Sequence, residues 1–120
     1  CTEHIGKVYA LQFVGGPYQY GGSDPHTGVD CSGFTRYVYQ HGAGITLNRS
    51  SRGQALQGKE ISADQMRPGD LLFYGSKSNI DHVAMYIGEG KIVHASTERT
   101  GITISNWNYR NPVKIRSIME

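Results

Sequence analysis

The order of hydrophobic patterns along the chain predicts an α+β fold with a central antiparallel sheet. Apolar residues recur with helical spacing up to about residue 41. From His82 onward the spacing changes to two, with Val83, Met85 and Ile87 on one face of a strand. Helical segments therefore come first and strands follow, which is the arrangement that this fold class requires.

Bulk properties are those of one globular domain spanning residues 1–120. A chain of this length can bury a real core without disulfides. The net charge of +2 and the lack of a Lys/Arg cluster give no reason to expect nucleic acid as a partner. Because no run of about 18 apolar residues occurs, we also expect no transmembrane segment.

A first, mostly buried helix is expected from the N-terminal segment. Thr2 can cap it, the apolar pattern continues to Val14, and Gly15-Gly16-Pro17 must end it. The next stretch, Pro17 to Gly22, is rich in tyrosine and glycine. Its tyrosines either line a cleft or belong to a well-packed surface loop, and local sequence does not decide between the two.

A second helix is expected from about Cys31 to His41, after the polar loop from Ser23 to Gly28. Asp30 can cap it, and apolar residues share one face at helical spacing. Gly33 near its start costs about 1 kcal/mol relative to alanine. We therefore expect another part of the chain to approach the helix backbone closely at this glycine.

The second half of the chain predicts short turns and five strands. Single helical turns are expected around Arg52–Leu56 and Ser62–Gln65, and Pro68-Gly69 marks a tight turn. Gly75 to Asp81 is expected to be a polar loop, and residues 107–112 form the last loop. The expected strands are Leu71–Tyr74, His82–Ile87, Lys91–Ser96, Ile102–Ser105 and Val113–Ile118.

Cys31 is the candidate nucleophile, because it lies at a predicted helix start between an acidic residue and Ser-Gly. The partial positive charge at a helix N-terminus lowers a thiol pKa and so favours the reactive thiolate. A neighbouring histidine would activate the thiol further. The backbone N–H of Cys31 could in addition stabilise an oxyanion.

Two of the five histidines, His82 and His94, lie on adjacent predicted strands. The other three lie in the first helix, in a loop and at the far end of the second helix. We expect His82 to act as the base toward Cys31, with His94 holding its other ring nitrogen. Both should lie on the sheet face that looks toward Cys31.

The register of the hairpin around Gly88-Glu89-Gly90 decides whether the two histidines cooperate. A strict two-residue turn places Met85 opposite His94 and puts the histidines on opposite faces. A three-residue loop, or an equivalent bulge, places Ala84 opposite His94 and brings His82 onto the same face. Gly90 suits the left-handed position that closes the longer loop, so we predict the second arrangement.

Each of these residues has a simpler interpretation. Cys31 alone could be a buried structural thiol, and each histidine alone could be an ordinary strand residue. Cysteine plus two histidines is also a zinc ligand set, but no fourth ligand is evident, so we expect no metal and no cofactor. A Cys1–Cys31 disulfide would consume the candidate nucleophile, and we do not expect it. Cys1 could instead carry a lipid, although truncation of a longer protein is the favoured interpretation.

Five stretches resemble the NlpC-type cell-wall peptidases, a bacterial family of papain-like cysteine hydrolases. They occur in the family's order: PYQYGG (17–22), GVDCSGF (28–34), RPGDLLFY (67–74), HVAMYIG (82–88) and IVHAS (92–96). The resemblance implies a papain-like fold with the nucleophile at the start of a helix packed on the sheet. It implies Cys31, His82 and His94 as the catalytic set.

The resemblance further implies roles for residues around the cysteine. Tyr18 matches the family's tyrosine near the oxyanion site, with Tyr20 as the second tyrosine of that motif. Asp30 matches an acidic residue of the family's substrate pocket, and Ser32 directly follows the cysteine. The segment Arg49-Ser50-Ser51 resembles a family segment that borders the cleft, although Asn48 replaces its usual proline. We expect these residues to contact substrate.

Family members typically hydrolyse the D-γ-glutamyl–diamino acid bond in the stem peptide of bacterial peptidoglycan. The resemblance therefore implies a monomeric endopeptidase that forms a thioester acyl-enzyme and acts outside the cytoplasm. A related amidase or acyltransferase and a non-catalytic wall-binding module are the alternatives. Reactivity of Cys31 and product analysis would separate the three.

Overall fold

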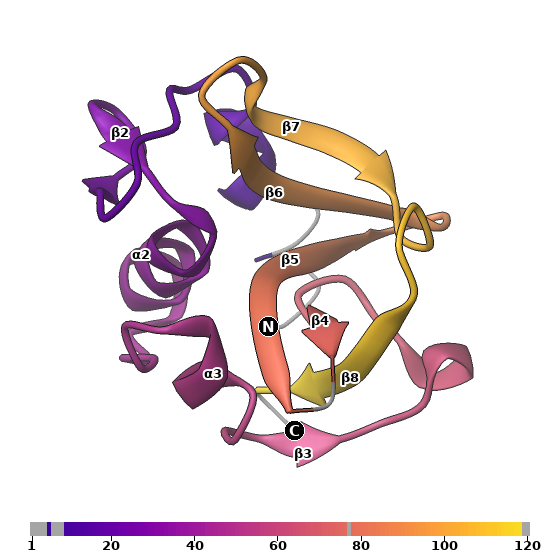
Figure 1. Ribbon diagram of the computed structural model, residues 1–120. Coiled ribbons are helices and arrows are strands. Elements are labelled where there is room, and N and C mark those ends of the chain that lie inside the picture. Colours follow the sequence, from indigo (N-terminus) through magenta and orange to yellow (C-terminus); the bar gives the residue numbers. More distant parts are fainter. Residues whose placement is uncertain (1–4, 6–8, 77, 119–120) are drawn as a thin grey trace.

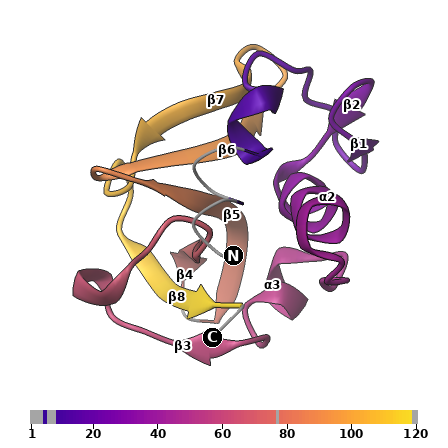
Figure 2. The same cartoon turned by 180° about the vertical axis from the view of Figure 1, so that it is seen from behind.

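The computed structural model describes residues 5, 9–76 and 78–118. Helices α2 and α3 lie on one side of the molecule and a strongly curved sheet forms the other, as both views show (Figures 1 and 2). The predicted α+β class with a central antiparallel sheet is therefore confirmed. The sequence predicted this arrangement from the change in hydrophobic spacing alone.

The main sheet has six strands within the described part of the chain, in the order β3-β8-β4-β5-β6-β7, and all of its pairings are antiparallel. Their bounds are β3 Lys59–Glu60, β4 Leu71–Ser76, β5 Asn79–Gly88, β6 Lys91–Thr97, β7 Gly101–Asn106 and β8 Pro112–Ser117. A separate small hairpin joins β1 (Ser23–Asp24) to β2 (Gly28–Val29). It lies beside the start of the long helix (Figure 1).

The long helix α2 runs from Cys31 to Ala43, so the predicted start at Cys31 is confirmed. The Asp30 carboxylate accepts the backbone N–H of Gly33 at 2.7 Å and caps the helix. The helix ends two residues later than expected, where Gly44 adopts the left-handed conformation with φ 71°. Shorter pieces are the 3₁₀ turns η2 (Ala10–Phe13) and η3 (Ala63–Gln65) and the helical turn α3 (Ser51–Gln54).

The predicted first helix falls mostly on residues 1–4 and 6–8, which lie outside the described residues. Its described end is the 3₁₀ turn η2. Two other expectations were wrong. Residues 75–81 are not a polar loop, because β4 continues to Ser76 and β5 begins at Asn79. Backbone pairing carries the hairpin through these polar residues, since ladder hydrogen bonds do not depend on side-chain polarity. The segment 23–28, expected to be a polar loop, contains β1 and the first residue of β2. These strands and β3 are too short to show an alternating pattern in the sequence.

The two faces of the sheet bury different cores. Helix α2 packs through Phe34 and Val38 on the face that carries Val83 and Met85. The opposite, concave face buries a second cluster of apolar residues: Leu72, Tyr74, Ala84, Ile92 and Ile115. Side chains alternate along a strand, so the even-numbered residues of β5 and β6, histidines included, belong to this second face.

The hairpin between β5 and β6 has the register that the histidines need. Gly88 pairs with Lys91, which leaves the two-residue turn Glu89-Gly90, and both turn residues have positive φ (55° and 74°). A bulge between Tyr86 and Gly88 then shifts the pairing, so that Met85 opposes Val93. Continuing this register places His94 opposite Ala84. The predicted bulge, rather than a three-residue loop, therefore sets the faces.

Gly33 is required by close packing. A Cβ added there would lie 2.4 Å from the carbonyl oxygen of Gly22, in the tyrosine- and glycine-rich loop. The expected approach of another element to the helix backbone is confirmed. The loop and the helix start are therefore held in direct backbone contact, and this contact fixes where the loop tyrosines lie relative to Cys31.

Gly33→Ala tests this contact, because helix propensity and packing predict opposite signs. Propensity alone would stabilise the protein by about 1 kcal/mol. The clash with Gly22 should instead lower the free energy of unfolding by about 1–3 kcal/mol. Urea denaturation followed by circular dichroism measures the difference, with the exposed helix position Gln40→Ala as the control. A gain in stability would contradict the packing argument.

Candidate active site

A cleft of about 530 Å³ opens at the N-terminus of α2. It contains every residue predicted for the site except the two histidines. These residues are Tyr18, Tyr20, Asp30, Cys31, Ser32, Arg49, Ser50 and Ser51. Gly21 and, from the start of β5, Ile80 and Asp81 complete the lining. The tyrosine-rich segment thus lines a cleft, which settles the alternative that the sequence left open.

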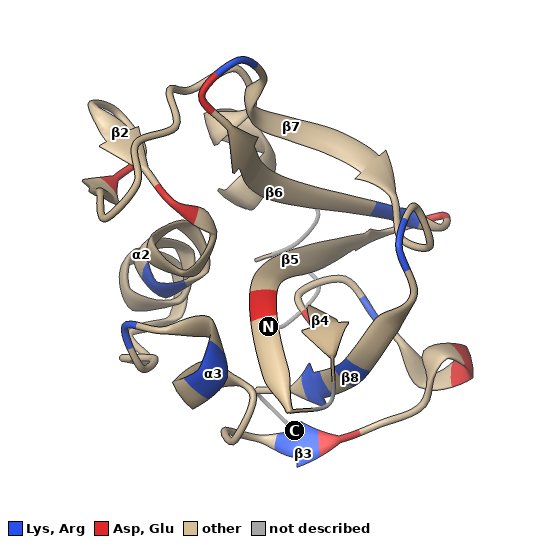
Figure 3. Ribbon diagram, viewed as in Figure 1, with Lys and Arg blue, Asp and Glu red and all other residues tan. Residues whose placement is uncertain are grey.

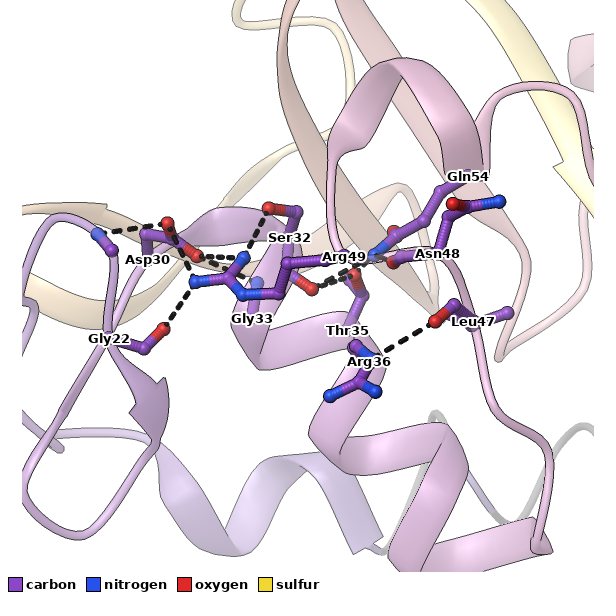
Figure 4. A network of polar contacts seen from close by, with 11 residues as sticks. Gly22, Asp30, Ser32, Gly33, Thr35, Arg36, Leu47, Asn48, Arg49 and Gln54 are labelled. Carbon is purple, nitrogen blue, oxygen red and sulfur yellow. Dashed lines mark hydrogen bonds and ion pairs between the residues drawn. The ribbon is translucent and has the colours of Figure 1, made fainter.

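An ion-pair network forms the floor of the cleft (Figure 4). The guanidinium of Arg49 donates to both carboxylate oxygens of Asp30, at 3.1 and 3.2 Å. It also donates to the Ser32 hydroxyl at 3.0 Å and to the Gly22 carbonyl at 3.0 Å. Bidentate geometry of this kind is rigid and directional. The guanidinium is thus occupied by protein partners and serves to fix the floor.

Gln54 supports the same floor from below, and the sequence analysis missed it. Its buried amide donates to the carbonyls of Ser32 and Asn48, at 2.9 and 2.8 Å. Its carbonyl accepts the Thr35 hydroxyl at 2.7 Å. These bonds tie the segment that carries Arg49 to the start of α2. A glutamine in a short polar turn gives no sequence signal of such a role, because its burial follows from tertiary packing.

Cys31 is a free thiol at the first position of α2, partly exposed in the cleft. Burial raises its pKa, and the negative charge of Asp30 adds to the rise. The backbone N–H groups of Val83, Ser32 and Cys31 itself act in the opposite direction, but burial outweighs them. The sequence-based expectation of a lowered thiol pKa is therefore corrected, because a helix N-terminus competes here with desolvation.

His82 and His94 form a direct hydrogen bond, with 2.7 Å between Nε2 of His82 and Nδ1 of His94. Burial, and to a lesser extent the neighbouring His94, lowers the pKa of His82 to about 3. Burial alone lowers the pKa of His94 to about 4. Both rings are consequently neutral at physiological pH, so His82 has a lone pair available to accept a proton.

The two histidines share a face, as predicted, but not the face that α2 covers. They lie on the concave face with Tyr74, whose ring centroid is 6.0 Å from that of His82. The Cys31 thiol reaches β5 from the helix side, at the backbone N–H of Val83. The thiol thus contacts β5 at the residue that follows His82. Strand alternation explains this difference from the sequence-based expectation.

Tyr18 lies at the cleft wall close to Cys31, held by a bridge to Val29 next to the helix cap. Burial raises the pKa of its hydroxyl, and the nearby Cys31 and Asp30 raise it further. The hydroxyl therefore stays protonated and can donate a hydrogen bond into the cleft. Tyr20, by contrast, is 88% exposed at the rim.

Tyr109 packs against His94 and was missed by sequence reasoning. Its ring centroid lies 5.3 Å from that of His94 and 5.3 Å from that of Tyr74. Burial raises the pKa of its hydroxyl, with a small contribution from Cys31. The residue lies in the irregular 107–112 loop, where no periodic pattern indicates a side-chain direction.

The cleft lining carries charges of both signs, namely Asp30, Asp81 and Arg49. Acidic residues stand at the start of α2 and on β5, and basic residues stand on and before α3 (Figure 3). Asp81 on β5 pairs with Arg110 at 3.2 Å in an exposed bridge. Such a mixed surface creates no single-sign field to steer a polyanion.

Among the residues that the structure describes, no three His, Cys, Asp or Glu side chains converge to hold a metal ion. The facing nitrogens of His82 and His94 are used by their mutual hydrogen bond. In the same part of the chain, no helix has the length and apolar character needed to span a membrane.

A cysteine at a helix start and a neutral, hydrogen-bonded histidine are components that thiol-dependent hydrolases use, and here the thiol contacts the strand residue next to the histidine. The model of the NlpC/P60 family matches residues 15–116, and the chain belongs to that family. The crystal structure of the NlpC/p60 domain of the peptidoglycan hydrolase SagA superimposes with a TM-score of 0.84 at 37% identity, over 92% of this chain and 93% of that one.

Curated relatives are longer than this chain. It is 40% identical over 108 residues to the gamma-DL-glutamyl hydrolase of Bacillus subtilis, which covers 90% of this chain and 24% of the relative. It is 43% identical over 95 residues to the probable endopeptidase p60 of Listeria monocytogenes, covering 79% of this chain and 17% of the relative. The chain thus spans about a quarter or less of these proteins.

Stability should fall as pH drops below about 6.5, because the unfolded histidines take up protons there and the folded pair does not. The loss should continue toward the folded pKa values of about 4 and 3. Between pH 7 and 5, buried His94 alone should account for about 2 kcal/mol of the loss. Urea titrations at both pH values measure it.

The double variant His82→Gln/His94→Gln should lose less stability over this pH range, whereas the exposed Thr46→Ala control, which removes no titratable group, should behave like the wild type. An unchanged pH dependence in the double variant would show that the pair is not held neutral by burial.

Proposed function

We propose that this chain is the catalytic part of a cysteine endopeptidase that hydrolyses peptidoglycan stem peptides at the D-γ-glutamyl–diamino acid bond. The observation that carries the proposal is the position of Cys31 in the cleft, between the Asp30–Arg49 floor and the Tyr18 wall. The relatives named gamma-DL-glutamyl hydrolase and peptidoglycan hydrolase support the choice of substrate.

In this mechanism His82 acts as general base. Its Nε2 is hydrogen-bonded to Nδ1 of His94, so Nδ1 of His82 is the nitrogen left to receive a proton. The thiol proton moves to Nδ1 as Sγ of Cys31 bonds to the scissile carbonyl carbon. Because both groups are neutral at rest, the proton moves during attack instead of residing on the imidazole beforehand.

The carbonyl oxygen becomes an oxyanion as the sulfur attacks. The backbone N–H of Cys31 at the helix start and the protonated Tyr18 hydroxyl are the donors proposed for it. The tetrahedral intermediate then breaks its C–N bond, and the leaving amine takes the proton from His82. A thioester to Cys31 remains.

Water completes the reaction. His82 takes a proton from the water as its oxygen bonds to the thioester carbon. The C–S bond then breaks, the carboxylic acid product leaves, and the proton returns to the sulfur. The neutral histidine pair is restored at the end of each cycle.

The setting proposed for this activity is extracytoplasmic, at the bacterial cell wall, where the relatives' named substrate lies. The protein would act there as a secreted thiol peptidase and as a monomer. A lipid on Cys1 would hold it at the envelope, and that residue lies outside the described residues.

Defined tripeptides test the proposal. L-Ala-γ-D-Glu linked to meso-diaminopimelate or to L-Lys should be cleaved between glutamate and the diamino acid, as mass spectrometry would detect. Cys31→Ala should abolish cleavage because the nucleophile is lost, and the fall should be at least about 10³-fold. The exposed Thr46→Ala variant should cleave at the wild-type rate.

Peptides with an α-linked or L-configured glutamate serve as substrate controls and should remain intact. Cleavage by Cys31→Ala equal to wild type would end the proposal. Intact tripeptides with release of another product would favour an amidase or acyltransferase on the same fold.

A further inference from the structure

We propose that Ser105 is a positioning residue that holds His94 in the tautomer required for His82 to act as a base. The inference rests on the proposed function and adds one residue to the hydrogen-bonded series that runs from His82 to His94. Ser105 lies on β7, and its hydroxyl oxygen is 2.9 Å from Nε2 of His94. The strand is predicted by the sequence pattern, whereas the contact of Ser105 with His94 is not.

The strand pairing explains why Ser105 can reach the ring. Thr103 lies directly opposite His94 in the β6–β7 ladder. Ser105 is two residues further along, so its side chain is on the same face and diagonal to His94. His94 is only 1% exposed. Its Nε2 therefore depends on a protein group for a hydrogen bond, and Ser105 is half-buried beside it.

Proton counting along the chain of bonds gives the role. For Nδ1 of His82 to accept the thiol proton, the proton of neutral His82 must be on Nε2. That N–H donates to Nδ1 of His94, which must therefore be bare. The proton of neutral His94 then sits on its Nε2 and needs an acceptor. The Ser105 hydroxyl supplies that acceptor.

The opposite arrangement is unproductive. If Nε2 of His94 were bare, its Nδ1–H would donate to His82, and Nδ1 of His82 would carry the proton. The thiol would then face an N–H instead of a lone pair. A serine hydroxyl can rotate to serve either arrangement. Once His82 is protonated, however, only the arrangement in which Ser105 accepts is compatible with the proton count.

The state with protonated His82 makes the contribution of Ser105 specific to catalysis. Protonated His82 donates to His94, and the polarised His94 ring donates more strongly to Ser105. Removing the hydroxyl leaves a buried N–H without a partner in the state where the bond matters most. The loss should therefore appear in kcat and leave substrate binding unchanged, since Ser105 does not line the cleft.

The first test is kinetic. Ser105→Ala should lower kcat on the cleaved tripeptide at least about tenfold, a partial loss of general-base catalysis, with KM unchanged. Ser105→Thr keeps the hydroxyl on a side chain that strands accommodate, and it should retain activity within about threefold of wild type. Ser105→Cys, with a weaker hydrogen-bonding group of similar size, should shift kcat in the same direction as alanine.

The second test needs no substrate, so it separates this proposal from the proposed function. Nitrogen-15 NMR of the histidine rings should show a smaller share of the Nε2–H tautomer of His94 in Ser105→Ala than in the wild type, because the variant leaves that buried N–H without an acceptor. Thr103→Ala removes the hydroxyl directly opposite His94 and should leave the tautomer unchanged. A single Nε2–H tautomer and wild-type kcat in Ser105→Ala would overturn the proposal.

Discussion

The hydrogen bond between His82 and His94 is the interaction on which the rest of the site depends. It requires both rings to emerge on the concave face of the sheet, and a single bulge in the β5–β6 hairpin sets that register. It also requires dry surroundings, and burial indeed lowers the pKa of both rings. Burial keeps both rings neutral, and a neutral imidazole can accept a proton where an imidazolium cannot.

Asp30 links the position of the nucleophile Cys31 to the floor of the cleft. One carboxylate caps α2 and thereby places Cys31 at the helix start, and the same group binds the guanidinium of Arg49. The position of the nucleophile and the shape of the cleft floor are consequently coupled through one side chain. Gln54 reinforces the coupling by joining the Arg49 segment to the helix backbone.

Sequence reasoning succeeded where a local rule determines the structure. The helix start at Cys31 follows from a capping residue, and the close approach at Gly33 follows from a glycine that the helix would otherwise disfavour. The shared face of the histidines follows from counting residues around a hairpin. The resemblance to known motifs added residues that the structure brings into one cleft.

The remaining features depend on tertiary packing, which local patterns do not encode. Tyr109 lies in an irregular loop, and Ser105 acquires its partner from the register of a neighbouring strand. The thiol pKa depends on the balance between the helix N-terminus and burial, and only the folded structure shows that burial prevails. Only the folded structure likewise shows that the histidines lie on the same face of the sheet as Tyr74.

The pH dependence of Cys31 alkylation tests the central claim that thiol and base are both neutral at rest. A raised thiol pKa means that little thiolate exists at pH 7, so the rate with iodoacetamide should keep rising as pH increases beyond about 9. The His82→Gln variant should show the same midpoint, because the resting histidine carries no charge to stabilise the thiolate. A rate that is already maximal near pH 6 in the wild type and falls in His82→Gln would reveal a preformed thiolate–imidazolium pair and contradict the account.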